Sequence, residues 1–229
     1  MAYDFIPRLE ILPLPQRRLW EEFVTIPKEF VLYGGTAVAL HLGHRASVVF
    51  DFFGNQPLNP VKLLPAVPFL AEAIVTQRQP DTFSCTVDRG GAVKLSFFGL
   101  PEIPRLQPPA IAPDHGLQVA SLLDLAGMKV SVVQMRAEAK DYLDIDAILA
   151  DGRIDLPSAL AAARAIYGRA FNPQNTLKAL TYFEDGNLHR LPEQVKERLV
   201  RAACAVDLDR LPVIVATAQT VHSGSGVSP

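Results

Sequence analysis

The sequence predicts an α+β fold in which a mixed β-sheet with flanking helices is followed by an α-helical C-terminal half. Three observations predict this fold. Short β-type runs bounded by glycine alternate with helical segments as far as residue 98. A proline-rich connector then spans residues 101–113, and beyond it every periodic segment has the spacing of a helix.

The connector is the expected domain boundary in this chain of 229 residues. We expect an α+β domain over residues 1–113, a helical domain over residues 114–210 that completes the functional site, and a tail over residues 211–229. The tail becomes small and polar from about Ala218, which predicts disorder.

The composition excludes several classes of protein. The net charge is −2, so there is no global basic excess of the kind that marks many nucleic-acid-binding domains, although a local basic patch remains open. Cys85 and Cys204 are the two cysteines, and neither lies in a CxxC pair, which argues against a disulfide framework or a zinc site. No signal peptide or membrane-length apolar run is visible, so we expect a cytoplasmic protein without a membrane partner.

The N-terminal elements follow from local patterns. Leu19, Trp20 and Phe23 form an apolar stripe that predicts a helix over residues 14–24, which Pro27 ends. After it we expect a strand over Phe30–Tyr33, a helix over residues 37–42, a strand over residues 47–53, a helix from beyond Pro60 to residue 74, and strands over residues 82–87 and 92–98 around a Gly90-Gly91 turn.

The C-terminal half is typical of a helical domain. Ser121 and Asp124 resemble a capping box before an apolar run. Proline near the start of each later segment fits the first turn of a helix. The predicted helices cover residues 122–135, 140–150, 157–170, 173–184 and 192–206.

The turn Gly34-Gly35-Thr36 lies between the first predicted strand and the helix that follows it. Glycines let backbone amides approach a ligand without hindrance from a Cβ atom. The N-terminus of a helix, with its free N–H groups and partial positive charge, suits a phosphate, and we expect Thr36 to cap the helix and to offer its hydroxyl. A tight turn without a ligand is the alternative interpretation.

Asp51 lies within a run of large apolar residues, VVF before it and FF after it. A carboxylate in a central apolar strand is costly unless it is paired or bound to a metal. The alternative is a strand-end aspartate that caps the following Gly54-Asn55 turn. Val49 and Asp51 share one face of the strand, because alternate side chains do.

Residues 32–53, LYGGTAVALHLGHRASVVFDFF, resemble the signature of the AbiEii/AbiGii nucleotidyltransferase toxin family, a branch of the DNA polymerase β-like nucleotidyltransferase superfamily. The family pattern is a Gly-Gly-Thr/Ser turn, a short helix, Gly-His-Arg, and a strand that carries Asp-x-Asp. The resemblance implies a nucleotidyltransferase-type fold. It implies nucleotide binding by Gly34, Gly35, Thr36 and Arg45, and a catalytic, metal-binding role for Asp51.

Downstream, Lys129, Arg136 and the segment KDYLD at residues 140–144 resemble further motifs of that family, so that the resemblance spans about residues 30–185. It implies catalytic roles for Lys129 and Asp141, with Lys129 also binding the nucleotide. The alternative interpretation of Lys129 is a lysine whose side chain reaches the surface past apolar neighbours. The alternative interpretation of Asp141 is an ordinary acid in the first turn of a helix.

The sequence departs from the family pattern at one carboxylate, because the first acidic position falls at Val49. Nucleotidyl transfer of this type normally uses two carboxylates to hold two Mg²⁺ ions. Asp51 can hold one ion together with the nucleotide, since Mg²⁺ is often bound by one or two carboxylates and substrate phosphates.

Two functions therefore stay open. The first is a Mg²⁺-dependent nucleotidyltransferase that moves an NMP from an NTP to an acceptor such as tRNA, as the toxin paired with a helix-turn-helix antitoxin. The second is a catalytically inactive protein of the same fold that binds nucleotide, RNA or a protein partner. Lys129 and Asp141 favour the first function, and Val49 favours the second.

Overall fold

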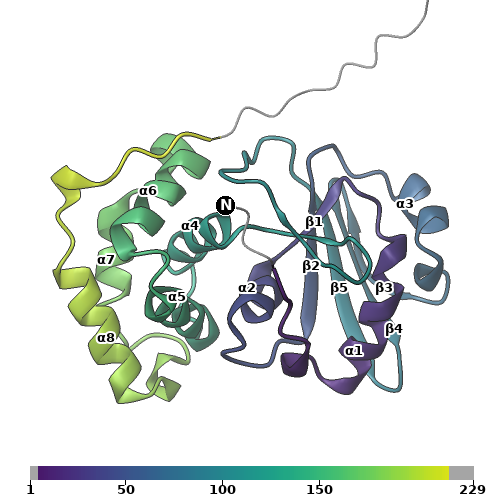
Figure 1. Cartoon of the computed structure of the whole chain (residues 1–229), viewed down its shortest axis with the longest axis horizontal. Helices are drawn as coiled ribbons and strands as arrows, with labels where there is room; N and C mark the ends of the chain where they lie inside the picture. The colour runs from purple at the N-terminus through teal and green to yellow at the C-terminus, as the bar shows by residue number, and fades with distance from the viewer. Residues whose placement is uncertain (1–4, 217–229) are drawn as a thin grey trace, which may run out of the picture.

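The computed structural model describes residues 5–216 and confirms the predicted fold class (Figure 1). A single mixed sheet has the strand order β3-β4-β5-β2-β1-β7-β6. Its strands are β1 Phe30–Tyr33, β2 Val49–Gly54, β3 Ile74–Gln79, β4 Thr82–Asp88, β5 Ala92–Gly99, β6 Ala110–Ile111 and β7 Gln118–Val119. The α-helices are α1 Leu14–Trp20, α2 Gly34–Leu42, α3 Pro60–Ala66, α4 Leu122–Val132, α5 Ala139–Asp151, α6 Leu156–Tyr167, α7 Pro173–Ala179 and α8 Glu193–Cys204.

The two faces of the sheet have different surroundings. One face is apolar and buried, and the ring of Phe23, which follows α1, packs edge-on against Phe50 and Phe52 there. Figure 1 shows α1 and α3 on this side of the sheet and α2, α4 and α5 on the other. We call that other side the open face. It carries Val49, Asp51 and Phe53 of β2, Thr82, Ser84 and Thr86 of β4, and Lys94, Ser96 and Phe98 of β5.

One predicted helix is wrong in its second half. The expected helix to residue 74 ends at Ala66, and a 3-10 turn over Pro68–Leu70 follows. Pro68 has no N–H to donate and disfavours helical geometry in the residue before it, so Val67 is the point at which the helix stops. Strand β3 then begins at Ile74. The sequence did not indicate this edge strand, because all six of its residues are exposed and lack apolar alternation.

Most other differences are shifts of element ends. Helix α1 gives way to a 3-10 turn over Glu21–Thr25, α4 ends at Val132, and α7 ends at Ala179. Helix α2 starts at Gly34 rather than after Thr36, so Thr36 is not its N-cap.

The connector of residues 101–113 is mostly irregular, as expected, but it contains β6. Strands β6 and β7 lie on either side of the predicted boundary after residue 113, and β7 pairs in parallel with β1. The buried core also runs through both halves, from Ile11 to Ala203. The division into two domains stays a prediction. Most of the predicted tail lies outside the described residues, and Ile214 and Ala216 at its start pack beside α6.

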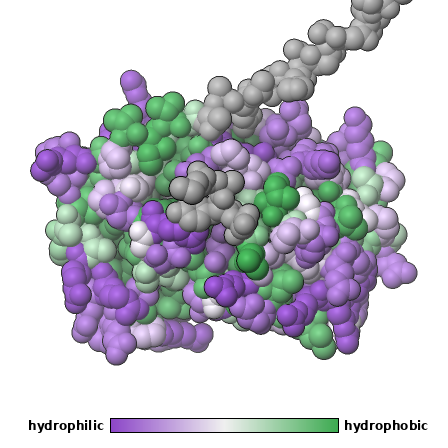
Figure 2. Space-filling model, in the orientation of Figure 1, coloured by the Kyte–Doolittle hydropathy of each residue, from purple (hydrophilic) through white to green (hydrophobic). Residues whose placement is uncertain are grey.

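The surface is mostly hydrophilic in the view of Figure 2, with hydrophobic side chains gathered over α6 at the upper left. Within residues 5–216, no helix is both long and apolar enough to cross a membrane.

Candidate functional site

Gly34 brings the start of α2 directly against Asp51. Strands β1 and β2 are antiparallel, with Tyr33 opposite Asp51. Gly34 has a φ of 72°, in the left-handed region, and a Cβ atom added to it would lie 2.6 Å from Asp51 Oδ2. Only glycine meets both conditions without strain. The predicted turn and the predicted carboxylate therefore belong to one site, at the N-terminus of a nine-residue helix.

The structure corrects the role expected for the Thr36 side chain. Thr36 is buried, and its hydroxyl donates to the backbone carbonyl of Val49 and lies 2.7 Å from Ser47 Oγ. The hydroxyl has one proton, which the Val49 carbonyl already accepts, so it has none to give a phosphate. The Thr36 hydroxyl instead connects α2 to β2.

Arg45 lies beside the same turn, because a Cβ atom on Gly35 would collide with its guanidinium. Arg45 Nε and Nη2 donate to Asp144 Oδ1 and Oδ2 at 2.7 and 2.9 Å, and Nη1 donates to the Ala46 carbonyl at 3.0 Å. Only its remaining N–H groups are available to a nucleotide. Nucleotide binding by Arg45 stays a prediction, and the pairing with Asp144 is the role visible in the structure.

Asp51 is a half-buried carboxylate on the open face. Burial raises its pKa, while the positive charges of Lys129, Lys140 and Arg136 act to lower it. Ser96, the residue beside it on β5, contributes a side-chain hydrogen bond. A carboxylate that is costly to ionise and surrounded by cations is suited to a metal ion or a polyphosphate–metal complex.

Lys129 and two aspartates form a buried ion-pair network between α4 and α5. Lys129 Nζ lies 2.7 Å from Asp141 Oδ1 and 2.6 Å from Asp144 Oδ2. Arg136 Nε donates to Asp141 Oδ2 at 2.8 Å. On the other side, His44 Nε2 lies 2.7 Å from Asp144 Oδ1. This network connects α4 and α5 to the loop that leads from α2 to β2.

Both aspartates of the network are held ionised. Burial acts to raise the pKa of Asp141, but Lys129 and Arg136 bring it below its ordinary value. Burial likewise acts to raise the pKa of Asp144, and hydrogen bonds from His44 and Arg45, with the charge of Lys129, hold it well below its usual range. Asp141 is fully buried, and both of its oxygens accept from cations, which holds the Lys129 ammonium group in place. A catalytic role for Asp141 stays a prediction.

Sequence reasoning did not single out Asp144 or His44 as site residues. The available signal was the Gly-His-Arg segment before β2 together with an aspartate three residues after Asp141 on one helix. Residues 44 and 144 are 100 positions apart, and only the fold shows that these two segments meet.

The donor set of the site fits one Mg²⁺ ion better than two. Among residues 5–216 there is no cluster of three or more His, Cys, Asp or Glu side chains arranged to hold a metal. Asp51 is the carboxylate that β2 contributes to the open face, with the Ser96 hydroxyl beside it. Val49 has the register expected for a second ligand but offers no donor atom. A single ion that shares its ligands with substrate phosphates needs no more than Asp51.

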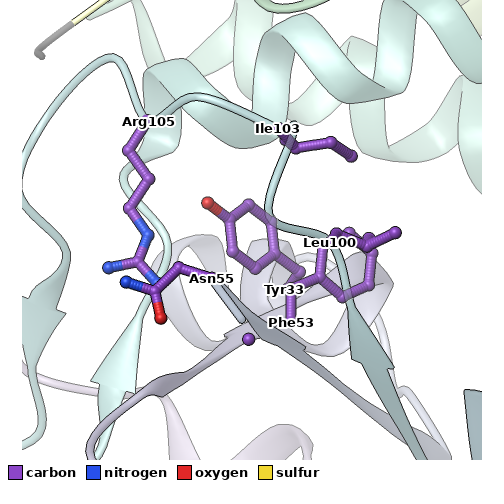
Figure 3. A pocket seen from close by; sticks show the side chains of 7 residues that line it. Tyr33, Phe53, Asn55, Leu100, Ile103 and Arg105 are labelled. Carbon is purple, nitrogen blue, oxygen red and sulfur yellow. The ribbon is translucent and has the colours of Figure 1, made fainter. Parts of the chain in front are cut away.

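Asp51 lies on the open face, and two hollows of the described structure lie elsewhere. A hollow between the sheet and the connector, lined by Tyr33, Phe53, Asn55 and Arg105, has room for about one water molecule, ≈ 10 Å³ (Figure 3). A larger hollow of ≈ 560 Å³ lies beside α3 and is lined by Phe30, among others. Neither hollow contains Asp51 or Lys129.

We predict that Gly34→Ala weakens NTP binding by at least about tenfold, which is about 1.4 kcal/mol. The added methyl would collide with Asp51 Oδ2 at the point where the phosphates are expected to bind. Calorimetric titration with each NTP and Mg²⁺ measures the effect. Gly152→Ala is the matched control, because Gly152 has a φ of 81° and a Cβ atom there would have nothing within 4 Å. Equal NTP affinity in both variants would show that the Gly34 turn is not part of the nucleotide-binding site.

The chain is similar to known proteins at the level of a family model, a sequence relative and two solved structures. The family model described as "Nucleotidyl transferase AbiEii toxin, Type IV TA system" matches residues 18–212. An uncharacterised protein of Aquifex aeolicus (strain VF5) is 30% identical over 174 residues, which cover 74% of this chain and 82% of that protein.

Two solved structures share the fold. The nucleotidyltransferase toxin MenT4 of Mycobacterium tuberculosis H37Rv aligns with a TM-score of 0.57 and 13% identity, over 84% of this chain and 82% of that one. A structure assigned as a nucleotidyltransferase from H. pylori aligns with a TM-score of 0.51 and 16% identity, over 82% of this chain and 89% of that one. The chain belongs to the AbiEii nucleotidyltransferase toxin family, which is described as part of type IV toxin–antitoxin systems.

Proposed function

We propose that this chain is a Mg²⁺-dependent nucleotidyltransferase that transfers an NMP from an NTP to an RNA acceptor, a tRNA end, in the cytoplasm. In this proposal it is the toxin of a pair whose partner is a helix-turn-helix antitoxin. The observation that carries the proposal is the contact of Gly34 with Asp51, which puts a helix N-terminus beside the open-face carboxylate.

The start of α2 supports binding of the triphosphate. The first N–H groups of a helix have no carbonyl partner within it, and they attract anions. Gly34 and Gly35 add no side chains of their own at this end of α2, so a ligand can approach the backbone between Asp51 and Arg45. Lys129, Lys140 and Arg136 all act electrostatically on Asp51, so their positive charge also falls where a triphosphate would bind. These features together favour a ligand that carries several negative charges.

Asp51 is the residue that would hold Mg²⁺ jointly with the nucleotide. When bound, the ion would neutralise charge on the phosphates and favour deprotonation of the attacking acceptor hydroxyl. In the overall reaction the acceptor oxygen bonds to the α-phosphorus, and the bond to the β-phosphate oxygen breaks with release of pyrophosphate. The chain's contribution is to position the phosphates at α2 and the acceptor hydroxyl at Asp51.

The buried network supports the reaction by holding the site together. Asp144 connects Arg45, which lies beside Gly35, to Lys129 on α4, and Asp141 holds Lys129 from the other side. The ammonium group of Lys129 is thereby fixed near Asp51 rather than free to rotate. We propose that Lys129 acts on the nucleotide from this fixed position, and that Asp141 and Asp144 are positioning residues.

Val49 favours the second candidate function, in which the protein binds nucleotide, RNA or a protein partner without catalysis. It stands beside Asp51 on the open face and offers no second metal ligand. The test is incubation of the purified chain with labelled NTPs, Mg²⁺ and total tRNA. The proposal expects label on tRNA that requires Mg²⁺ and disappears in Asp51→Ala. NTP binding without any transfer would support the second candidate instead.

We predict that Val49→Asp restores a second metal site and speeds transfer by about tenfold or more. The new carboxylate would lie on the same face as Asp51, one side chain along the strand, which is the register of the family's acidic pair. Counting bound Mn²⁺ by electron paramagnetic resonance, with a non-hydrolysable NTP present, should give one ion for the natural chain and two for the variant. Val48→Asp is the control, since Val48 is exposed and precedes β2. An unchanged ion count and rate in Val49→Asp would contradict the single-carboxylate interpretation.

A further inference from the structure

The open face extends well beyond Asp51, across β5 and β4. Along both strands the side chains of the opposite face are buried, whereas Ser84, Thr86 and Ser96 are half-buried and Lys94 is exposed. This part of the sheet is therefore accessible. It adjoins the proposed reaction site, and neither phosphate binding nor metal binding as described above uses it.

A row of hydroxyl groups leads away from Asp51 across the strands. Ser96 hydrogen-bonds the Asp51 carboxylate, and Ser96 Oγ lies 3.2 Å from Ser84 Oγ. Register explains the row, because Asp51, Ser96 and Ser84 are successive neighbours on β2, β5 and β4. Strands lie about 4.8 Å apart, so the row offers hydrogen-bonding groups at short, regular intervals.

The charge of this surface suits a polyanion. Lys94 lies between Val49 and Thr86 in the sheet, and its ammonium group forms no ion pair within residues 5–216. Asp88, which follows Thr86 on the same face of β4, already accepts from the N–H groups of Gly90 and Gly91. Lys94 is thus a free cation beside the site.

An aromatic pair borders the same surface. Phe98 and Phe53 pack edge to face with ring centroids 5.3 Å apart, and both are half-buried. On the open face, Phe98 is the next side chain after Ser96 on β5, and Phe53 is the next after Asp51 on β2. Open sheet faces that combine hydroxyls, a cation and aromatic rings bind single-stranded nucleic acid, in which the unpaired bases stack on the rings.

We infer that the open face of β4 and β5 binds the single-stranded end of the RNA acceptor and leads its terminal hydroxyl to Asp51. Lys94 contacts a phosphate, Ser84 and Ser96 hydrogen-bond the sugar or base, and Phe98 stacks on a base. This inference rests on the proposed function, and it adds the location at which the unpaired end of that acceptor binds, on β4 and β5.

The test is fluorescence anisotropy with a labelled single-stranded RNA of about 12 nucleotides. Asp51→Asn is the background for all samples, so that no transfer occurs during the measurement. We expect Lys94→Ala to reduce the slope of log affinity against log salt by about 0.7, the value for one phosphate contact on a single strand. Phe98→Ala is expected to weaken binding at least about fivefold, and Phe98→Trp to restore it.

Lys62→Ala is the matched control, because Lys62 is an exposed lysine on α3, which lies on the opposite side of the sheet (Figure 1). Circular dichroism verifies that each variant is folded. Binding by the Lys94 and Phe98 variants equal to that of the Lys62 control would overturn the inference, as would tighter binding of duplex than of single-stranded RNA. The natural chain could bind RNA through Lys94 and Phe98 and yet transfer no label. That result would support the RNA-binding surface and reject the proposed catalysis.

Discussion

Asp51→Asn is expected to reduce nucleotidyl transfer by about 10³-fold or more, because the loss of a metal-bound carboxylate costs several kcal/mol at the transition state. The amide keeps the size of the side chain and its hydrogen bond with Ser96, so the fold should be preserved. It removes the negative charge that three nearby cations surround. Single-turnover transfer of labelled NMP to tRNA measures the effect.

The size of this effect follows from the absence of a second carboxylate. Where two acids share the metals, each keeps some function when the other is lost. Here Val49 occupies the other position and offers no donor atom that could replace the lost carboxylate. Asp88→Asn is the control, since Asp88 is an exposed acid at the far end of β4. Transfer in Asp51→Asn within about threefold of the natural rate, a difference of less than 1 kcal/mol, would mean that the catalytic carboxylate lies elsewhere.

Asp144→Asn is expected to lower the free energy of unfolding by about 3–5 kcal/mol, because it leaves buried cations without their partner. The Asp144 carboxylate is fully buried and contacts His44, Arg45 and Lys129. For a chain of this size the loss corresponds to a fall of about 10 °C in the unfolding temperature. Thermal unfolding followed by circular dichroism measures it.

Asp146→Asn is the matched control two residues along the same helix. Asp146 pairs with Arg198, whose side chain is 48% exposed, so solvent screens that pair and the loss should be much smaller. If the two substitutions lowered the free energy of unfolding equally, the buried network would stabilise the fold no more than an exposed ion pair does.

Acid titration gives an independent measure of the same contribution. The pKa of Asp144 is lowered in the folded chain, so its stabilising effect is complete above the unfolded value of about 3.9 and is lost as the pH falls below it. Stability of the natural chain should therefore decline more steeply between about pH 5 and pH 2 than that of Asp144→Asn. If stability declined equally steeply in the two proteins between about pH 5 and pH 2, the assigned ionisation of Asp144 would be contradicted.

The sequence was most informative where local chemistry determines structure. Gly34 and Asp51 stood out because a glycine turn and an acid in an apolar strand are unusual in themselves, and the fold brings them into contact. Strand β3 was missed because its residues are exposed on both faces, which removes the periodic signal. The role of Thr36 was wrong because its hydroxyl bonds across to Val49, and local sequence does not reveal which carbonyl a hydroxyl will meet.

The buried network was the least predictable part of the site. Lys129 and Asp141 were predicted as site residues. The sequence did not show that the two side chains pair and neutralise each other's charge. Pairing between α4, α5 and the loop after α2 depends on how separate elements pack. The resemblance to a family predicted which residues belong to the site, and the packing then showed which of them form ion pairs with one another.

The proposed nucleotidyl transfer depends on Asp51, with Val49 at the position of the second carboxylate. The most direct test compares the natural chain, Asp51→Asn and Val49→Asp for transfer of labelled NMP to total tRNA at one Mg²⁺ concentration. We expect the natural chain to label tRNA far faster than Asp51→Asn and more slowly than Val49→Asp. Label from Val49→Asp alone, with the natural chain no faster than Asp51→Asn, would contradict this expectation.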